Sequence, residues 1–241
     1  MSVVRLDKLI ANITMQTRSD VKKLIRSGRV KINAEVCKVV DYKIDTQKDV
    51  LIIDDEEKII KEKIYLMMNK PSGVISATVD KVDKTVIDIV PQKYKRKDLF
   101  PIGRLDKDTQ GLLIITNDGE FAHKITSPSK NIFKKYEAKL DGNFTKVMQK
   151  SFECGIILKN GEKCKPAYTQ IIDIDNKIVQ IQICEGKYHQ VKRMFASVGL
   201  KVLNLERLEI GSLKLDSKLN KGECKELSEI DKLQIFISNI T

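Results

Sequence analysis

The chain has 241 residues, of which 41% are hydrophobic and 32% charged, a composition that favours a folded protein with one medium-sized domain and one small one. It contains no apolar run near the roughly 20 residues that a membrane helix needs, and its first residues lack the apolar stretch of a secretory signal, so we exclude a membrane protein and expect a cytoplasmic one. The net charge of +11 at pH 7 favours an anionic partner.

Five cysteines are scattered along the chain, without a close pair of the kind that forms a zinc knuckle or a redox motif. They are Cys37, Cys154, Cys164, Cys184 and Cys224. We therefore expect free thiols that are buried as small hydrophobic side chains, with no metal and no disulfide.

The first forty residues are strongly basic, with nine Lys or Arg against three Asp or Glu and a local net charge of +6. A helix is expected after Thr17, because Thr followed three residues later by Asp20 is typical of a helix start, and Gly28 is a natural end for it. The apolar face of this helix consists of Val21, Leu24 and Ile25. A helix with this pattern packs one face on a domain core.

Three cations, Arg18, Lys22 and Arg26, recur every four residues along the same helix and therefore share one exposed face. No Asp or Glu stands at pairing distance among them, so they repel one another unless phosphates lie alongside. A solvated surface is the simpler interpretation. We nevertheless interpret the face as a binding site for phosphate groups, because phosphates would offset this repulsion.

The segment around this helix resembles the S4 RNA-binding domain over residues 4–55. The stretches that carry the resemblance are Arg5-Leu6-Asp7-Lys8-Leu9-Ile10-Ala11, the helix, and Ser27-Gly28-Arg29-Val30-Lys31-Ile32-Asn33. Ala34 departs from the family, which usually has Gly after Asn at this turn. Because Ala is strained at the positive backbone angles of an Asn-Gly turn, we expect the turn to differ locally.

The acidic run 54–57 and the polar stretch that follows it to Lys63 are interpreted as connecting chain, whose charge discourages RNA binding. We therefore place an S4 domain at residues 1–58, a linker at 59–63 and a catalytic domain at 64–241.

From residue 64 onward, short apolar strands and amphipathic helices interleave irregularly. The expected strands cover 64–68, 112–116, 136–140, 178–183 and 202–210, and the expected helices cover 144–154 and 188–198. This order predicts an α+β domain with a mixed, mainly antiparallel sheet flanked by helices, rather than a strictly parallel sheet.

A lone carboxylate, Asp106, stands between basic residues in a turn just before the strand 112–116, where a catalytic acid would be displayed. For any single Asp an ordinary turn residue is the commoner explanation, but three further motifs accompany this one. They are Asn69-Lys70-Pro71-Ser72-Gly73, Lys134-Lys135-Tyr136 and Glu185-Gly186-Lys187-Tyr188-His189-Gln190-Val191-Lys192-Arg193-Met194. With the run 103–119, these motifs resemble the RNA pseudouridine synthase family over residues 64–230.

In that family an aspartate acts on the target uridine while the bond from the sugar to N1 of uracil breaks and the sugar rejoins C5, and the resemblance assigns this role to Asp106. The resemblance implies that Lys192 is the cation that keeps the carboxylate ionised. Arg193 is the second candidate for this role; if Lys192 has it, we expect Arg193 to contact the RNA. The resemblance also implies that Tyr136 stacks on the flipped uracil and that Arg104 enters the space that the base leaves. Because the isomerisation gains and loses no atoms, we expect no cofactor and no metal.

The residues Tyr188-His189-Gln190 stand where family members that modify large-subunit RNA typically carry Asn-Arg-Gln or Asn-Arg-Glu. Together with His123-Lys124-Ile125-Thr126-Ser127-Pro128 they resemble the RsuA-type branch, which modifies small-subunit (16S) ribosomal RNA. The resemblance implies the family's uridine 516 as target, with ribosomal RNA or the assembling small subunit as the partner of a monomeric enzyme. We expect both histidines to pack or hydrogen-bond near the site rather than to catalyse.

Three alternatives stay open. The order Asp106-Lys107-Asp108-Thr109 also resembles the acidic signature of magnesium-dependent phosphotransferases of the haloacid dehalogenase type, but that signature follows its apolar strand, whereas here the strand comes after. A non-catalytic RNA-binding module would explain the basic helix and leave the other motifs as coincidence. The third alternative is the same enzyme acting on 23S ribosomal RNA or on transfer RNA.

Overall fold

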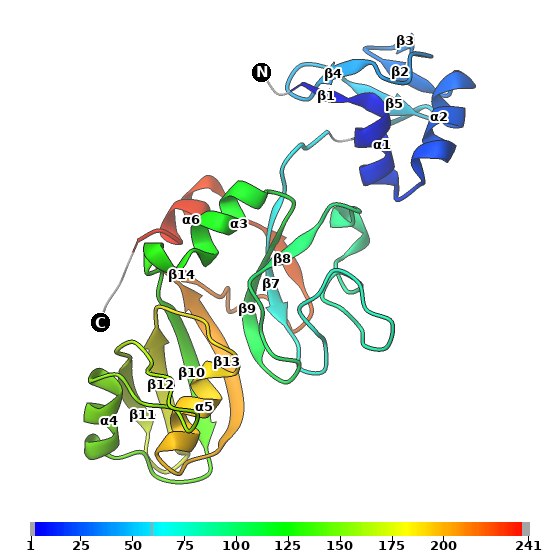
Figure 1. Ribbon diagram of the computed structural model, residues 1–241. Coiled ribbons are helices and arrows are strands. Elements are labelled where there is room, and N and C mark those ends of the chain that lie inside the picture. The colour runs from blue at the N-terminus through cyan, green and yellow to red at the C-terminus, as the bar shows by residue number, and fades with distance from the viewer. Residues whose placement is uncertain (1–2, 59, 238–241) are drawn as a thin grey trace. The chain divides into compact units, whose positions relative to one another are not determined.

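A computed structural model describes residues 3–58 and 60–237 and shows two compact units (Figure 1). The first contains the residues up to Ile64 together with Pro91–Leu99, and the second contains Tyr65–Val90 together with the residues from Phe100 onward. Within the described ranges, no helix is long and apolar enough to cross a membrane.

The segment Pro91–Leu99, which the expected boundaries place in the catalytic domain, packs with the first unit. Its Arg96 is buried, donates a hydrogen bond to the backbone oxygen of Lys61 and forms a 2.9 Å ion pair with Asp98. Asn12 Nδ2 donates to the same Asp98 carboxylate at 2.9 Å. A short segment that lies between two strands of the second unit in the sequence is thus part of the first unit.

The first unit consists of short strands and two helices that enclose a small apolar core. Its elements are β1 (Val3–Arg5), α1 (Leu6–Thr14), α2 (Arg18–Arg26), β2 (Val30–Ile32), β3 (Glu35–Val36), β4 (Lys43–Asp45), β5 (Leu51–Ile53), β6 (Glu56–Lys58) and the 3₁₀ turn η1 (Gln92–Tyr94). Strands β3, β2, β5 and β6 form an antiparallel sheet in that order, and β1 pairs with β4.

The expected helix after Thr17 is confirmed as α2. The Thr17 hydroxyl accepts a hydrogen bond from Asp20 N at 3.2 Å, and Gly28 follows the helix at φ +78°. The three apolar side chains lie in the core, with Val21 and Ile25 fully buried. The cationic face formed by Arg18, Lys22 and Arg26 is exposed.

The interpretation of the acidic run 54–57 as connecting chain is wrong, because these residues belong to a hairpin of β5 and β6. Asp54 and Asp55 make the turn between β5 and β6. Arg29 Nε lies 2.5 Å from the Asp54 carboxylate, and Lys31 Nζ lies 2.7 Å from that of Asp55. Acidic residues that look like a linker in the sequence therefore pair with cations of the neighbouring strand region.

The turn at Ala34 does not differ from the Asn-Gly geometry. It joins β2 to β3 with two residues, and both have positive φ, +52° at Asn33 and +71° at Ala34. Such a turn matches the right-handed twist of the two strands. The hairpin therefore keeps its geometry at a steric cost to Ala34.

Among the residues that the structure describes, the second unit is built on a nine-stranded sheet with helices beside it (Figure 1). Its elements are β7 (Tyr65–Lys70), β8 (Phe100–Ile102), β9 (Gln110–Thr116), α3 (Gly119–Thr126), the 3₁₀ turn η2 (Pro128–Lys130), β10 (Lys134–Leu140), α4 (Lys146–Glu153), β11 (Tyr168–Asp173), β12 (Ile178–Ile183), α5 (Gln190–Ser197), β13 (Val202–Ile210), β14 (Leu213–Lys214), β15 (Cys224–Glu226) and α6 (Glu229–Gln234). The strand order is β11-β12-β10-β13-β9-β7-β15, with β14 beside β13 and β8 beside β9.

One contact in this sheet is parallel and very short. Strand β13 pairs with β9 through two residue pairs, Glu206 with Gln110 and Arg207 with Gly111, while the other pairings are antiparallel. Gly111 has φ +97°, and a Cβ added there would lie 2.3 Å from the Arg207 backbone oxygen. Glycine is therefore needed where the two strands meet.

The predicted fold class is confirmed: the protein is α+β, with a mixed, mainly antiparallel sheet. The five cysteines are free thiols, as expected. Four of them are buried, but Cys154 is exposed, because it follows the last turn of α4 on the side away from the core residue Phe152. The expectation of burial is wrong for that residue.

Candidate active site

The loop that carries Asp106 runs between β8 and β9 and is held by a buried lysine. Lys70, the last residue of β7, is fully buried, and its Nζ donates hydrogen bonds to four backbone oxygens. These belong to Pro71, Asp106, Lys107 and Thr109, at 2.8–3.3 Å. Burial lowers the pKa of Lys70 to about 8, and the carbonyl oxygens around it favour the charged form at neutral pH.

A second clamp fixes the residue before Asp106. The Ser76 hydroxyl donates to the Leu105 backbone oxygen at 2.9 Å and accepts from the Leu105 backbone nitrogen at 3.0 Å, and both residues are buried. The backbone nitrogen of Gly73 also donates to the Lys107 oxygen at 2.8 Å. The Asp-bearing loop is thus held in one conformation before any substrate arrives.

The Asp106 carboxylate faces two basic side chains from the region of α5. Lys192 Nζ lies 3.0 Å from Oδ2, and His189 Nε2 lies 3.4 Å from Oδ1. The ammonium of Lys192 also lies 2.5 Å from the Asp108 carboxylate, so it is shared between two aspartates. The expected partner of Asp106 therefore contacts it directly.

The charge of Lys192 is strongly favoured. Burial lowers its pKa, but hydrogen bonds to Asp108 and Asp106 outweigh that effect, and the net result is a raised pKa. The same Lys192 hydrogen bond lowers the pKa of Asp108 against the opposing effect of burial. At neutral pH the site therefore contains a fixed ammonium among carboxylates.

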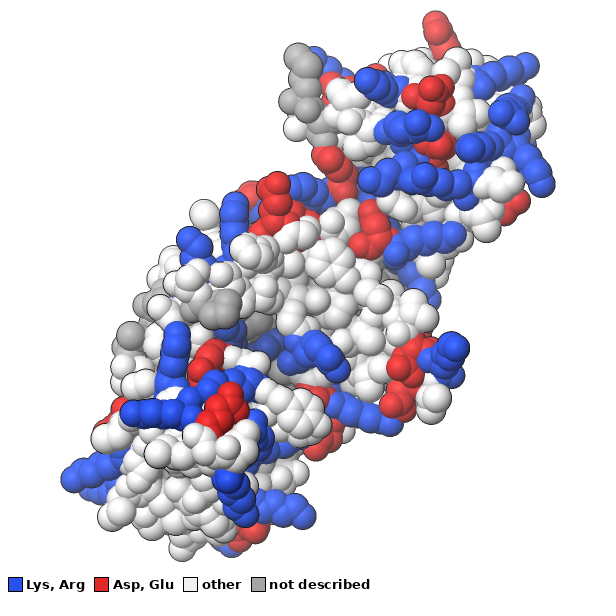
Figure 2. Space-filling model, in the orientation of Figure 1, with Lys and Arg blue, Asp and Glu red and all other residues white. Residues whose placement is uncertain are grey.

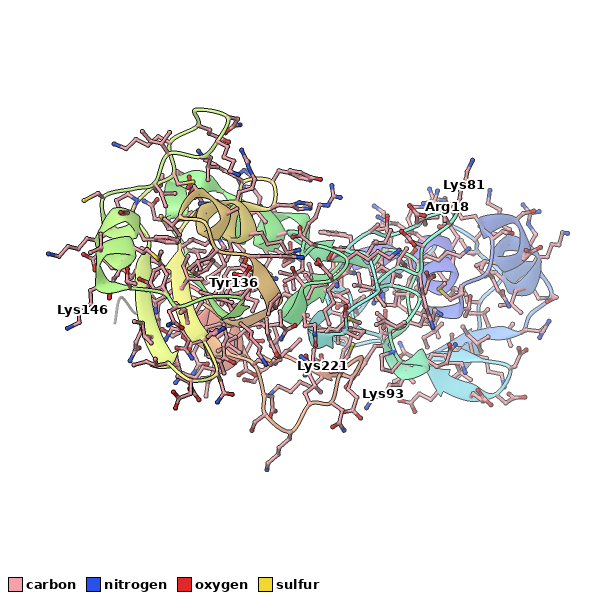
Figure 3. All side chains as sticks on the ribbon, turned by 90° about the horizontal axis from the view of Figure 1, so that it is seen from below. Arg18, Lys81, Lys93, Tyr136, Lys146 and Lys221 are labelled. Carbon is pink, nitrogen blue, oxygen red and sulfur yellow. The ribbon has the colours of Figure 1, made fainter. Side chains whose placement is uncertain are left out.

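A pocket of about 70 Å³ opens beside these groups. Its lining includes Arg104, Asp106, Tyr136, His189 and Lys192. Tyr136 comes from β10 and is 9% exposed; it is labelled in Figure 3. The structure thus brings the three expected catalytic residues to one pocket, with Arg104 exposed at its wall.

His189 stands at the start of α5 in an unusual conformation. Its φ is +46°, in the left-handed region, and its ring stacks on that of Tyr188 with centroids 3.8 Å apart. Non-glycine residues in this region are strained and are often found at functional sites. His189 thus packs on Tyr188 and lies 3.4 Å from Asp106, as expected, whereas His123 is exposed on α3 and does not show the expected packing.

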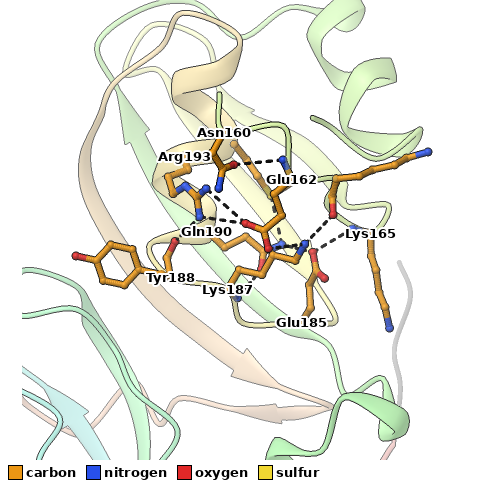
Figure 4. Close-up of polar contacts among 10 residues, drawn as sticks. Asn160, Glu162, Lys165, Glu185, Lys187, Tyr188, Gln190 and Arg193 are labelled. Carbon is orange, nitrogen blue, oxygen red and sulfur yellow. Dashed lines mark hydrogen bonds and ion pairs between the residues drawn. The ribbon is translucent and has the colours of Figure 1, made fainter. Parts of the chain in front are cut away.

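Arg193 points in a different direction from Lys192. Its guanidinium lies 3.5 Å from the Glu162 carboxylate and donates to the Tyr188 backbone oxygen at 3.2 Å (Figure 4). Lys187 Nζ lies 3.0 Å from the same Glu162. Of the two adjacent cations, Lys192 reaches Asp106, whereas Arg193 joins the segment before α5 to the loop around Glu162.

The cationic face of α2 belongs to the first unit. Lys and Arg side chains are spread over the visible surface of that unit (Figure 2), and Arg18 projects from it in Figure 3. The side chains of Arg18, Lys22 and Arg26 are exposed, as a surface that binds RNA phosphates requires.

Sequence reasoning missed three residues of this site. Asp108 has no role in the pseudouridine synthase interpretation of the sequence, yet its carboxylate binds Lys192. Lys70 lies in one of the four motifs, but three of its four carbonyl contacts are to a loop 36–39 residues away. Arg207 is a single charge in an apolar strand and lies with its Cζ 6.0 Å from the centre of the Tyr136 ring, a contact for which the sequence offers no signal.

The arrangement suits nucleophilic or acid-base chemistry on a flat ring. A partly exposed carboxylate is paired with a fixed ammonium and lies in the same pocket as an aromatic face. Within the described ranges, no group of three or more His, Cys, Asp or Glu side chains is arranged to hold a metal ion.

Comparison with known proteins agrees with this chemistry. Residues 64–197 match the RNA pseudouridylate synthase family, and residues 4–51 match the S4 domain. An uncharacterized RNA pseudouridine synthase of Bacillus subtilis is 42% identical over 94% of this chain and 95% of its own length. The ribosomal small subunit pseudouridine synthase A of Haemophilus influenzae is 40% identical, covering 95% of this chain and 99% of its own.

Two further similarities extend over the whole chain. The ribosomal large subunit pseudouridine synthase B of Bacillus subtilis is 38% identical over 95% of both chains. A crystal structure of a pseudouridylate synthase superposes with a TM-score of 0.67 at 37% identity, covering 96% of this chain and 99% of the other. With its S4 domain and catalytic domain both matched, this chain belongs to the RNA pseudouridylate synthase family.

Proposed function

We propose that this RNA pseudouridine synthase isomerises one uridine of small-subunit (16S) ribosomal RNA, with Asp106 as the residue that acts on the target nucleotide. The observation that carries the proposal is the position of the Asp106 carboxylate, which lies 3.0 Å from Lys192 and shares a pocket with Tyr136. The enzyme would act as a monomer in the cytoplasm, on ribosomal RNA or on the assembling small subunit.

The residues divide the work as follows. The target uridine leaves its stack, at a cost of about a few kcal/mol, and stacks on Tyr136 beside Asp106. The ionised Asp106, held by Lys192, assists cleavage of the bond from C1′ to N1 of uracil. The ring then turns, C1′ bonds to C5, the proton leaves C5, and N1 gains a proton. No atom is gained or lost, so the proposal includes no cofactor and no metal.

Other residues bind the RNA around that nucleotide. Arg104, exposed at the pocket wall, enters the space that the flipped base leaves in the RNA. Arg18, Lys22 and Arg26 on α2 neutralise phosphates of the same RNA. Arg193 stays a predicted RNA contact, although in the structure its guanidinium is bound to Glu162.

Small-subunit RNA is favoured by the residues Tyr188-His189-Gln190 and by the 40% identity to a small-subunit enzyme. The second candidate is large-subunit RNA, since a relative that is named for that substrate is 38% identical over 95% of this chain. The two candidates share one mechanism and differ only in the RNA that is bound.

The test maps pseudouridine by carbodiimide-dependent reverse-transcription stops on unmodified 16S and 23S RNA, incubated with the protein plus chelator. We expect one new stop in 16S RNA, at uridine 516, that is absent with Asp106→Asn. The matched control is Asp175→Asn, a change in the exposed turn between β11 and β12, which should leave the stop intact. A stop in 23S RNA alone would mean that the enzyme acts on large-subunit RNA. A fully active Asp106→Asn variant would falsify the role of Asp106.

A further inference from the structure

A second cavity of about 380 Å³ adjoins the catalytic pocket. The two share Arg104, Tyr136 and Gly186 in their linings. Asp106 and Lys192 line the smaller pocket only, while the lining of the larger cavity includes Lys134 of β10 and residues of β13, β8 and α3. The larger cavity therefore offers space beside the place where the proposed function puts the uracil.

The larger cavity contains two cations without an acidic partner. Lys134 of β10 and Arg207 of β13 line it, and among the described residues no hydrogen bond or ion pair engages the Lys134 ammonium. Arg207 is 5% exposed; its Nε donates to the Leu112 backbone oxygen at 2.7 Å, but its Nη2 is buried without a hydrogen-bond partner. A buried donor left without an acceptor destabilises the folded protein unless a ligand supplies the acceptor.

The acidic side chain in the cavity wall does not neutralise these cations. Glu185 Oε1 accepts hydrogen bonds from the Gln190 amide at 2.6 Å and from the Lys165 backbone nitrogen at 3.0 Å. Burial, together with the charge of Arg207, lowers the pKa of Lys134 to about 8, so at pH 7 most of it is still protonated. The cavity thus holds uncompensated positive charge that an anion would satisfy.

We propose that Lys134 and Arg207 bind a phosphodiester group of the RNA that adjoins the target uridine. The proposal rests on the proposed function, which places that uridine in the Asp106 pocket. A backbone phosphate is favoured over the uracil carbonyl oxygens because Lys134 and Arg207 line the larger cavity and not the Asp106 pocket. Apolar walls from Ile102, Ile125 and Ile210 suit the sugar or base attached to the phosphate.

The contact explains how the sugar stays in place during the reaction. Once the bond from C1′ to N1 is broken, the uracil and the ribose must keep a fixed separation for C5 to meet C1′. Tyr136 holds the ring, and a phosphate held by the arginine and lysine pair anchors the ribose through its own backbone. Lys134 and Arg207 are therefore substrate-positioning residues.

The first experiment uses the unchanged protein and alters the RNA. A 16S fragment that the enzyme modifies is made with a neutral methylphosphonate at each phosphate near the target, one at a time, and Kd is measured by titration. We expect one position to weaken binding about tenfold, since a charge-assisted contact is lost. If the methylphosphonate leaves Kd unchanged at every position near the target, the proposal is wrong.

The second experiment combines that RNA with variants of the enzyme. Lys134→Met should raise Kd for the unmodified fragment about tenfold and reduce the slope of log Kd against log salt by about 0.7–0.9. The same variant should lose little more with the methylphosphonate RNA, because the two changes remove one contact. Lys134→Arg should restore most of the affinity.

The matched control is Lys135→Met. Lys135 is the next residue of β10, points to the other side of the strand and lies 3.5 Å from Glu209, outside both cavities. It should change neither the salt slope nor the response to methylphosphonate. Should Lys134→Met slow a single turnover with Kd and salt slope unchanged, the cations act on the base and the proposal is overturned. Failure of the proposed function is distinct, since the unchanged enzyme would then form no pseudouridine in any fragment.

Discussion

Lys192 is bound to two carboxylates, and one of them lines the catalytic pocket. Asp106 lies in the pocket wall, whereas Asp108 meets the same ammonium from outside the described lining. Two aspartates two residues apart therefore differ in their surroundings because of where the loop directs their side chains, and the loop is held by Lys70 and Ser76.

The two aspartates can be told apart by the same substitution. Asp106→Asn should lower the single-turnover rate about 10⁴-fold or more, as expected for a group that acts on the reacting atoms. Asp108→Asn should keep at least about a tenth of the rate, because Lys192 remains paired with Asp106. Both predictions are measured as single-turnover rates on a 16S fragment that the unchanged enzyme converts. Equal losses in the two variants would mean that Asp108 also takes part in the chemistry.

Ala34 shows the cost of an unusual residue in a tight turn. Its φ of +71° is disfavoured by its Cβ. We expect Ala34→Gly to raise the free energy of unfolding by about 0.5–1 kcal/mol, the strain relief being partly offset by a more flexible unfolded chain. Chemical denaturation measures it. Ala196→Gly, at an exposed position of α5, should have the opposite sign.

At the scale of elements, α2 combines a structural face with a binding face. Its apolar side chains build the core of the first unit, and its cationic face lies in solvent. We expect the triple change of Arg18, Lys22 and Arg26 to Ala to weaken RNA binding. The slope of log Kd against log salt should fall by up to about 0.9 for each phosphate contact that is lost. Folding should persist, since none of the three is buried.

The charge-matched control for that variant changes Lys146, Lys150 and Lys159 of the second unit to Ala. All three are exposed, and Lys146 projects from α4 in Figure 3. If both triple variants flatten the salt slope equally, the α2 face has no special part in binding and net charge alone accounts for it.

The pairing of β9 with β13 depends on one glycine. Gly111→Ala would place a Cβ against the Arg207 backbone at a φ that Ala disfavours, so we expect a loss of about 2–4 kcal/mol. A fall of at least about 5 °C in Tm is the corresponding measurement. Gly119→Ala is the control, because no atom lies within 4 Å of an added Cβ and α3 begins there.

Long elements were predictable from sequence, and short ones were not. The strands 178–183 and 202–210 are confirmed with the expected bounds, since each carries a sustained apolar pattern. Strands β8 and β14, of three and two residues, exist only because a neighbouring strand supplies hydrogen bonds. The turn after β5 and the strand β6 resemble connecting chain in the sequence, because their acidic residues carry no apolar pattern that would indicate strand pairing.

The same contrast holds for the site. Asp106, Tyr136 and Lys192 were found through motifs, and the structure places them in one pocket. Lys70 and Arg207 were not assigned roles, because a buried charge is explained only by the distant backbone oxygens that surround it. Tertiary contact, rather than local pattern, determines what such residues do.

At the scale of the whole molecule, Lys134 affects stability in alkaline solution. Its pKa is about 8 in the folded protein against 10.5 as the ordinary value, so between these pH values the unfolded chain binds more protons. Stability from this group therefore rises as pH increases from 8 to 10.5. Cys224, whose pKa burial raises to about 12, has the opposite effect above pH 9.

A comparison with one variant isolates the lysine. Near pH 7 the Tm of Lys134→Met should exceed that of the unchanged protein by the largest amount. At pH 10 this difference in Tm should be smaller by about 2 °C or more. Contributions from Cys224 and other groups cancel in that difference. A difference that does not depend on pH would mean that Lys134 has an ordinary pKa.

The two-pair contact between β9 and β13 divides the large sheet into two half-sheets, β11-β12-β10-β13 and β9-β7-β15. Asp106 precedes β9 in one half, while Tyr136 and Lys192 belong to the other. The three residues that we propose for catalysis are therefore divided between the two halves, and we expect a fragment or truncation that keeps one half to have no pseudouridine synthase activity. With the site residues proposed here, the reaction requires the two half-sheets to be joined in one folded domain.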